Sequence, residues 1–301
     1  MAETRRPIRL LRTAVIFAVI LVSISSSSLL VVASGATAVA CAFWRVFLAS
    51  AMLGGTMVLR QRRTGLQLDQ RRLTWSLVSG GLLAVHFLLW MESLFLIPIA
   101  VSTTVVVTYP LFTLLIDHFL FREGIGRRQI FGLAAGFIGV LLFLHPQILP
   151  AADLHGLLLA FGGALGATGY FSIGRLVRRT TDVLQYTVVT YASAAAFLLA
   201  YALFRGEDLW TYAPQTYAFF VMLAVLPMIG GHTLINYLLR YVKTSVATAI
   251  ALGEPVGASL LAYLLLQQQV DGPQGVVMAV VLSSIAVTIT QETMKDPHAS
   301  P

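Results

Sequence analysis

Charged residues are scarce in this sequence. Asp, Glu, Lys and Arg make up only 11% of its 301 residues, whereas an ordinary soluble domain has about 25%. Hydrophobic residues make up 57% of the chain, and the mean hydropathy is +0.83. This composition excludes a water-soluble domain and predicts an all-α integral membrane protein.

Cysteine is almost absent. Cys41 is the only one, and it lies in an apolar run. A single cysteine excludes an internal disulfide, and it also excludes a metal site built from several cysteines. We expect neither a metal nor a cofactor in this chain.

Long apolar runs are abundant. A helix needs about 20 apolar residues to cross the hydrocarbon core of a membrane, and ten segments qualify, of which the fifth and tenth are short. The first run follows a basic start but is too long for a signal peptide, so we expect it to be retained as a helix. The ten expected spans are 13–33, 37–59, 73–96, 99–121, 129–144, 154–176, 183–204, 217–239, 245–266 and 276–290.

The basic residues fall almost entirely on one side of these spans. Of the 20 Lys and Arg residues, 18 lie in the tails and connections of one side, Arg205 lies on the other side, and Arg45 lies within a span. The positive-inside rule then predicts that both termini are cytoplasmic. The same distribution explains the net charge of +7 with the lipid bilayer as partner and no nucleic acid.

The second half of the sequence repeats the first at a shift of 145 residues. The shift pairs Pro110 with Pro255, each in the middle of a span. Each half has five expected spans, and because five is odd, the second half enters the membrane from the opposite side. Two inverted repeats are an architecture of secondary transporters. We expect a first repeat at 1–146, a second repeat at 153–292 and a cytoplasmic tail at 293–301.

Several short motifs occur in an order and spacing typical of one family. They are Trp44-Arg45, Tyr109-Pro110, Glu254-Pro255, Arg122-Glu123 followed by Gln129-x-x-Gly132, and Gly163-Ala164-x-x-Ala167-x-x-Tyr170 followed by Arg175. Together with the basic start and the two halves, they make the chain resemble the drug/metabolite transporter superfamily in its EamA-domain branch. The chain departs from that family at its serine-rich stretch 23–28, where a tryptophan and a glycine are common, and at Gln268, where an acidic residue is expected.

This resemblance implies a secondary transporter of the bacterial inner membrane. The branch moves small organic solutes, commonly outward, and includes exporters of aromatic and other amino acids. The resemblance therefore implies that this chain exports amino acids by alternating access, and we expect it to act as a monomer. Drugs and nucleotide- or sugar-type metabolites are the alternative substrates.

An intramembrane enzyme and an ion channel are the alternatives from other classes. An enzyme needs paired acids, a metal cluster or a nucleophile with its base, and the nearest approach to these is Asp117-His118 at a membrane edge. A channel needs a filter-like loop or a ring of charges, and the sequence has neither. We expect no catalytic residues.

Four ionisable residues lie inside the expected spans, where a charge costs about 2.5–3.5 kcal/mol at the bilayer centre. Arg45 and Glu92 lie in the outer halves of their spans, and the simplest interpretation is a structural ion pair that neutralises both. His86 and Glu254 lie near the middle of theirs. For these two, a substrate contact and a purely structural role both remain open.

The candidate substrate-binding residues are His86, Trp90, Tyr109, Glu254 and Asn236. Trp90 follows His86 by one helical turn on the same face, so an imidazole and an indole ring lie together. Tyr109 and Glu254 precede Pro110 and Pro255, which remove backbone donors and predict a kink or hinge in each half. Asn236 belongs to a polar stripe with His232 and Arg240 at steps of four residues, which leads to the cytoplasmic side.

Overall fold

The computed structural model describes residues 6–60, 69–148, 153–266 and 272–293. Within these ranges the chain forms helices and connecting loops and no strand. Of the expected tail 293–301, residues 294–301 lie outside the described residues, as do residues 1–5 of the expected first repeat and residues 149–152 between the repeats. The helices are α1 (Arg6–Ser25), α2 (Ser27–Ala33), α3 (Ala38–Arg60), α4 (Gln70–Ser93), α5 (Ile99–Val106), α6 (Tyr109–Phe119), α7 (Arg127–Ile148), α8 (Leu154–Arg178), α9 (Val183–Arg205), α10 (Pro214–Leu223), the π-helix η2 (Ala224–Thr233), α11 (Leu234–Leu238), α12 (Thr244–Thr248), the 3-10 helix η3 (Ala249–Gly253), α13 (Glu254–Leu266) and α14 (Gly272–Thr293).

In the part of the chain that the structure describes, eight helices are long and apolar enough to cross a membrane, and four of them are interrupted. They confirm eight of the expected spans, and most of their first and last residues lie within a few residues of the expected bounds. The expected fifth and tenth spans correspond to α7 and α14, each 22 residues long. These two helices are not among the eight, so the count of ten remains a prediction. The eight are Ala14–Ala33, Ala38–Leu59, Gln70–Ser93, Ile99–Phe119, Leu154–Arg178, Val183–Arg205, Pro214–Leu238 and Thr244–Leu261.

The repeat is visible in the helix bounds. Adding 145 to the bounds of α3, 38–60, and of α7, 127–148, gives 183–205 and 272–293, which are the bounds of α9 and α14. The same shift carries α4 onto the interrupted span formed by α10, η2 and α11, and carries α6 onto α13. The two halves of the chain therefore place their helices at equivalent positions along the sequence.

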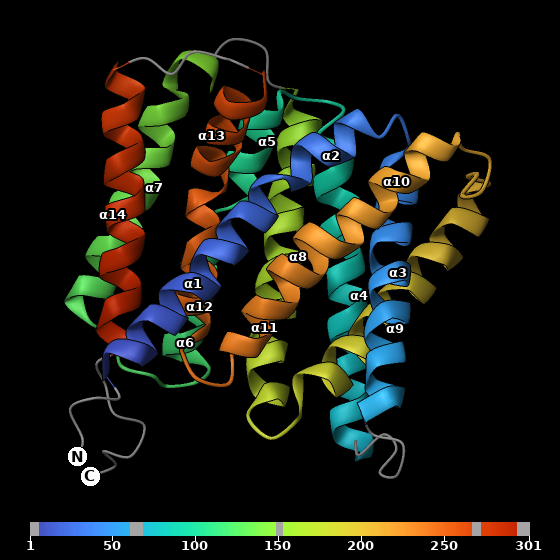
Figure 1. Cartoon of the computed structure of the whole chain (residues 1–301), viewed down its shortest axis with the longest axis horizontal. Helices are drawn as coiled ribbons and strands as arrows, with labels where there is room; N and C mark the ends of the chain where they lie inside the picture. The colour runs from blue at the N-terminus through green and yellow to red at the C-terminus, as the bar shows by residue number, and fades with distance from the viewer. Residues whose placement is uncertain (1–5, 61–68, 149–152, 267–271, 294–301) are drawn as a thin grey trace.

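Equivalent helices of the two halves pack against each other. Helix α3 packs on α9, and α7 packs on α14 (Figure 1). The equivalent spans Ile99–Phe119 and Thr244–Leu261 meet where α6 packs on α12. The packing of α4 on α8 has its counterpart in the packing of η2 on α1, since the shift exchanges these helices. Exchanging the halves thus reproduces the same set of contacts, as expected for two repeats related by a two-fold axis.

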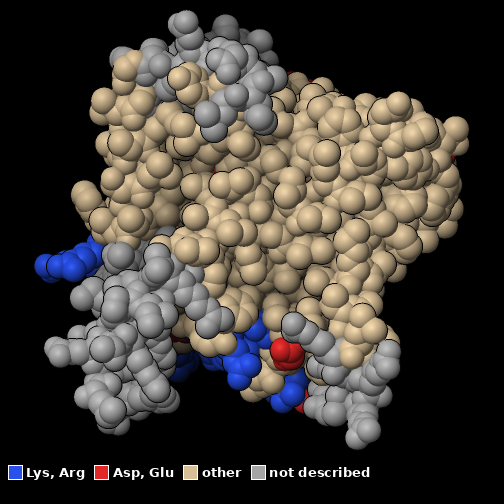
Figure 2. Space-filling model, in the orientation of Figure 1, with Lys and Arg blue, Asp and Glu red and all other residues tan. Residues whose placement is uncertain are grey.

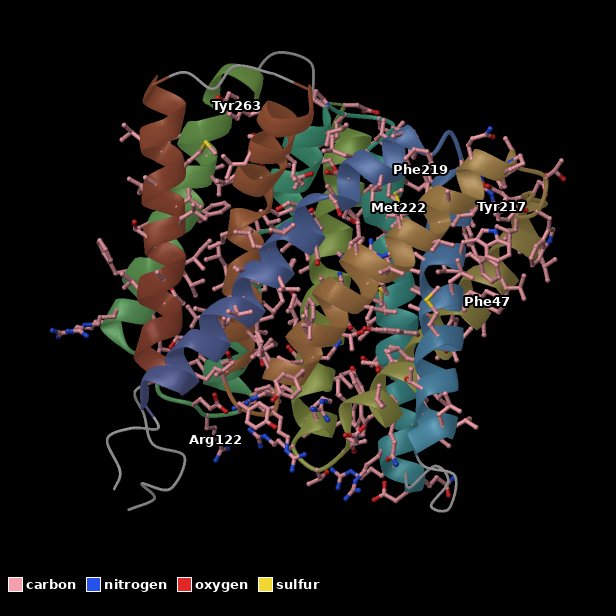
Figure 3. The ribbon with its side chains drawn as sticks, in the orientation of Figure 1. Phe47, Arg122, Tyr217, Phe219, Met222 and Tyr263 are labelled. Carbon is pink, nitrogen blue, oxygen red and sulfur yellow. The ribbon has the colours of Figure 1, made fainter. Side chains whose placement is uncertain are left out.

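Apart from Arg45 and Arg205, the described Lys and Arg side chains gather toward one end of the molecule, hereafter the basic end, where Figure 2 shows most of the visible blue side chains. Arg122 marks this end and Tyr263 lies at the opposite one (Figure 3). Helix α4 begins at the basic end beside Arg72, whereas its counterpart span Pro214–Leu238 ends there, before Lys243. Equivalent helices of the two halves therefore run in opposite directions.

The flanks of the molecule between these ends are apolar. Phe47 on α3 and Met222 on α10 are each 43% exposed and project from the ribbon on this surface (Figure 3). Because lipid tails are as apolar as these side chains, such a surface is stable in a bilayer and unstable in water.

Two spans are interrupted where proline predicted it. Helix α5 ends at Val106, and α6 begins at Tyr109 with Pro110 in its first turn. In the second half, the 3-10 helix η3 precedes α13, which begins at Glu254 with Pro255 next. The Thr108 hydroxyl donates to the carbonyl of Val105 (2.7 Å). This bond satisfies a backbone acceptor at the first break.

Two further interruptions were not expected. The first span breaks at Ser26, between α1 and α2, where Ser25 Oγ donates to the carbonyl of Leu21 (2.6 Å) and Ser26 Oγ to that of Ser23 (2.8 Å). Serine hydroxyls compete in this way with the backbone ladder. The eighth span widens into the π-helix η2 around Pro227, whose missing N–H removes one regular hydrogen bond.

Helices α4 and α9 lie in close contact at Gly80. A Cβ atom there would lie 2.5 Å from both the Thr190 carbonyl oxygen and Ser193 Cβ. Backbone cannot give way as a flexible side chain does, so the helices would have to separate.

We expect Gly80→Ala to lower the free energy of unfolding by about 1–3 kcal/mol, as overpacking does. Gly55→Ala on α3 is the matched control, because a Cβ there meets nothing within 4 Å, and we expect it to be neutral or slightly stabilising. Thermal unfolding of the purified proteins in detergent measures both. Equal stability of the two variants would contradict the close contact.

Candidate functional site

A small polar cavity lies between the two halves of the chain. It receives side chains from α1 to α6 on one side and from η2 and α13 on the other. All four interrupted spans contribute a residue at or beside the break, so the breaks and the cavity coincide. The cavity is lined by Ile24, Ser27, Arg45, His86, Trp90, Val106, Tyr109, His232 and Glu254.

Arg45 is the most buried charge in this cavity. Its side chain is 1% exposed, Nη1 donates to Ser27 Oγ (2.9 Å), and the guanidinium lies 4.1 Å from the centroid of the Phe87 ring. Both Arg45 and Glu92 lie in the described part of the chain, and no carboxylate there lies within 4.0 Å of the Arg45 guanidinium. The prediction that Arg45 pairs with Glu92 is therefore wrong.

Glu92 lies on a different side of α4 from the cavity. It follows Trp90 by two residues, which turns it about 200° around the helix axis. Its charged neighbours are Glu207, Arg205 and His155, at the end opposite the basic end. The carboxylate that shares the cavity with Arg45 is instead Glu254, whose side chain is 7% exposed.

Aromatic rings form the rest of the cavity wall. His86 and Trp90 are stacked, with ring centroids 6.0 Å apart and an interplanar angle of 5°, so the predicted pair is present. The ring centroid of Tyr109 lies 6.5 Å from that of His86, and the ring centroid of His232 lies 6.0 Å from that of His86. Four of the five expected substrate-binding residues, His86, Trp90, Tyr109 and Glu254, thus meet in one cavity.

His86 is partly satisfied by the protein itself. Its Nδ1 lies 2.8 Å from the Gly163 carbonyl oxygen on α8. Helix α8 comes this close because of its glycines: a Cβ at Gly166 would lie 2.9 Å from the His86 backbone nitrogen. The bond to Gly163 fixes the ring and leaves its other nitrogen for the cavity.

Asn236 does not line the cavity. Its amide donates to the Tyr170 hydroxyl and to the His232 carbonyl (2.8 Å), so it lies behind the wall. A direct substrate contact of Asn236 stays a prediction. The residue of the same stripe that does face the cavity is His232. Arg45, Ser27 and His232 are the polar cavity residues that the sequence did not identify as binding.

The basic end of the molecule is closed by polar contacts between the halves, hereafter the latch. Asp117 Oδ2 accepts hydrogen bonds from Ser245 N (2.8 Å) and Ser245 Oγ (2.6 Å). Gln129 Nε2 also donates to Ser245 Oγ (2.6 Å), and the Thr113 and Thr248 hydroxyls lie 3.1 Å apart. These contacts join α6 and α7 of the first half to α12 of the second.

A second layer of contacts lies further out at the same end. Glu123 Oε1 lies 3.0 Å from Arg175 and 3.3 Å from Arg179, and Lys243 Nζ donates to the Gly124 carbonyl (2.7 Å). Asp117 is thus occupied by the latch, and its neighbour His118 is exposed and lies 3.4 Å from the Glu123 carbonyl. The two do not form an acid–base pair in this conformation.

A larger hollow of about 370 Å³ lies between α7 and α14, but it has a different character. Its walls are wholly apolar, as on a surface that faces lipid. Because it offers no hydrogen-bonding side chain, it lacks the polar groups that orient a metabolite. Its lining residues are Phe131, Ala134, Ala135, Ile138, Gly139, Leu142, Val277 and Val280.

Two packed halves that run in opposite directions, with a polar cavity at their helix breaks, define a membrane transporter fold. The model of the EamA-like transporter family matches residues 13–145 and 154–290. The chain therefore belongs to the EamA-like transporter family, the EamA branch of the drug/metabolite transporter superfamily, and it does so through two repeats. Members of this family are membrane transporters of small molecules rather than enzymes.

Comparison with solved structures supports the same fold. A structure described only as "Crystal structure of protein" superposes with a TM-score of 0.75 at 20% sequence identity, over 92% of this chain and 97% of that one. At this identity the likeness concerns the fold alone. No match to a curated protein sequence was found.

The latch predicts how the cavity becomes accessible. We expect a Thr113→Cys variant, in a Cys41→Ser background, to react slowly with a hydrophilic maleimide, because Thr113 is buried behind Asp117. Adding Asp117→Asn removes charged hydrogen bonds worth about 1.5–3 kcal/mol, so labelling should accelerate about ten- to hundredfold.

The control is Asp69→Asn, which changes an exposed carboxylate at the basic end that caps α4 and does not touch the latch. It should leave the labelling rate unchanged. Equal rates with Asp117→Asn and Asp69→Asn would show that Asp117 does not hold this end closed.

Proposed function

We propose that this chain is a ten-span secondary transporter, built as two inverted five-helix repeats, that exports small amphipathic metabolites by alternating access. Amino acids, aromatic ones included, are the proposed substrates. We place it as a monomer in the bacterial inner membrane, with the basic end and both termini in the cytoplasm. The observation that supports this most is the polar cavity between the halves, located where four helices are interrupted.

The cavity supports alternating access because it is closed. Its volume of about 20 Å³ holds roughly one water molecule, which is too little for an amino acid. A solute therefore enters only when the helices around the cavity move. The breaks before Tyr109 and Glu254, and the π-helix η2, lie beside the cavity and provide places where such helices bend.

The lining of the cavity supports an amphipathic solute. The rings of His86, Trp90 and Tyr109 offer faces for an apolar or aromatic side chain. Arg45 and Glu254 offer one charge of each sign, and Ser27 a hydroxyl. A free amino acid carries an apolar or aromatic side chain and both charges in one small molecule. A neutral sugar has no charged group to pair with Arg45 or Glu254.

The first test is transport by the purified protein in liposomes. We expect saturable uptake of labelled amino acids, measured with a panel of amino acids, nucleosides and sugars, and competition among the amino acids. If only nucleosides or sugars are transported, the proposed substrate class changes from amino acids to those compounds. Loss of all movement across the panel would contradict amino-acid transport altogether.

The same liposomes test coupling to protons. If transport is proton-coupled through Glu254, a pH gradient should drive uptake in the wild type, and Glu254→Gln should abolish this dependence. Identical rates with and without the gradient in the wild type would establish downhill facilitation instead.

We expect His86→Ala and Tyr109→Ala each to reduce amino-acid transport about two- to tenfold, since each removes a ring from the cavity worth about 0.5–1.5 kcal/mol in stacking. Membrane expression should remain normal. Glu92→Gln is the matched control, because Glu92 lies outside the cavity, and it should transport as the wild type does. Normal transport in both ring variants would remove these residues from the site.

A further inference from the structure

Arg45 is an unusually costly residue to bury where it lies. A buried ion costs several kcal/mol unless it is paired and hydrogen-bonded. In the described part of the chain, no carboxylate lies within 4.0 Å of the guanidinium, and Arg45 Nε is buried with no hydrogen-bond partner. Ser27 and the Phe87 ring compensate only part of this cost.

Glu254, on the other side of the cavity, is also a buried ionisable group whose hydrogen bonds are incomplete. Its Oε1 is buried, and within the described ranges it has no hydrogen-bond partner. Arg45 is its charged neighbour in the structure, yet the two do not form an ion pair. Arg45 comes from α3 in the first half and Glu254 from α13 in the second. Two opposite, incompletely satisfied charges therefore face one cavity from the two halves.

A carboxylate of a solute would satisfy what Arg45 lacks. Guanidinium groups bind carboxylates through two parallel N–H donors, and these charge-assisted bonds are among the strongest in proteins. The Phe87 ring lies 4.1 Å from the guanidinium and limits its freedom, while Arg45 lines the cavity. A solute ammonium group would likewise satisfy Glu254.

We propose that Arg45 is the specificity-determining residue of the site and binds the carboxylate of the transported solute, with Glu254 receiving its ammonium group. This inference rests on the proposed function and narrows it. The substrate class is a zwitterion with a free carboxylate and an apolar or aromatic body beside His86 and Trp90. Amines and alcohols of the same shape are rejected, because they leave a buried guanidinium without its anion.

The test compares three molecules that share one ring: phenylalanine, phenylalaninol, which lacks the carboxylate, and 3-phenylpropionate, which lacks the ammonium group. Each unlabelled compound competes with labelled phenylalanine in counterflow by the protein in liposomes. For the wild type, phenylalaninol should need about a ten- to hundredfold higher concentration than phenylalanine to compete, as expected for one lost charged hydrogen-bonding group.

Variants of Arg45 and Glu254 test whether Arg45 causes the difference in competition between phenylalanine and phenylalaninol. In Arg45→Gln, phenylalanine should lose its advantage over phenylalaninol, whereas Arg45→Lys should keep part of it. Glu254→Gln should weaken competition by phenylalanine more than competition by 3-phenylpropionate. Arg205→Gln is the control, since it removes an arginine near the end of α9 outside the cavity, and it should behave as the wild type.

The outcomes separate the inference from the proposed function. Counterflow in which the wild type accepts phenylalaninol as readily as phenylalanine overturns the role of Arg45 and leaves transport standing. A preference for phenylalanine that persists in Arg45→Gln does the same. Absence of phenylalanine counterflow in the wild type overturns the amino-acid substrate and this inference with it. If Arg45→Gln does not fold, the wild-type comparison and Arg45→Lys decide.

Discussion

In a bilayer, each backbone N–H and C=O must find its partner inside the protein, and this constraint determines where the site lies. An interrupted helix leaves such groups unpaired, so an interruption is tolerated only where it is covered by protein or lines a cavity. Four spans of this chain are interrupted, and all four contribute to the cavity between the halves. Serine, threonine and proline residues at these points therefore form the site and also set where the helices bend.

The packing of the two halves depends on the same breaks. Helix α1 packs on η2, and α4 packs on α8, so each half contributes one interrupted and one uninterrupted span to these two pairs (Figure 1). Glycines bring α8 within contact of the His86 backbone, which places one ring of the site. Close packing and the polar site are therefore one arrangement rather than two separate features.

Much of this fold can be predicted from the hydropathy and the repeat of the sequence, because both show where along the chain each span begins, breaks and ends. The span bounds, the breaks before Tyr109 and Glu254, and the meeting of His86 with Trp90 were predictable for that reason. The Arg45–Glu92 pair was not, because membrane depth says nothing about how each helix is rotated about its axis. The π-helix η2 was not expected either, because the proline inside it, Pro227, removes a backbone donor without fixing whether the helix kinks or widens.

The repeat also shows how two similar halves make two different ends. The latch acid Asp117 has Ala262 as its counterpart at the shift of 145, and Glu123 has Gln268. The carboxylates that tie the halves together at the basic end therefore have no acidic equivalents at the opposite end. There, α8 meets the α4–α5 connection through apolar contacts such as Gly156 with Ile97. Because charged hydrogen bonds are strong and directional while apolar contacts are non-directional and depend on the area buried, we expect the two ends of one symmetric scaffold to need different free energies to open.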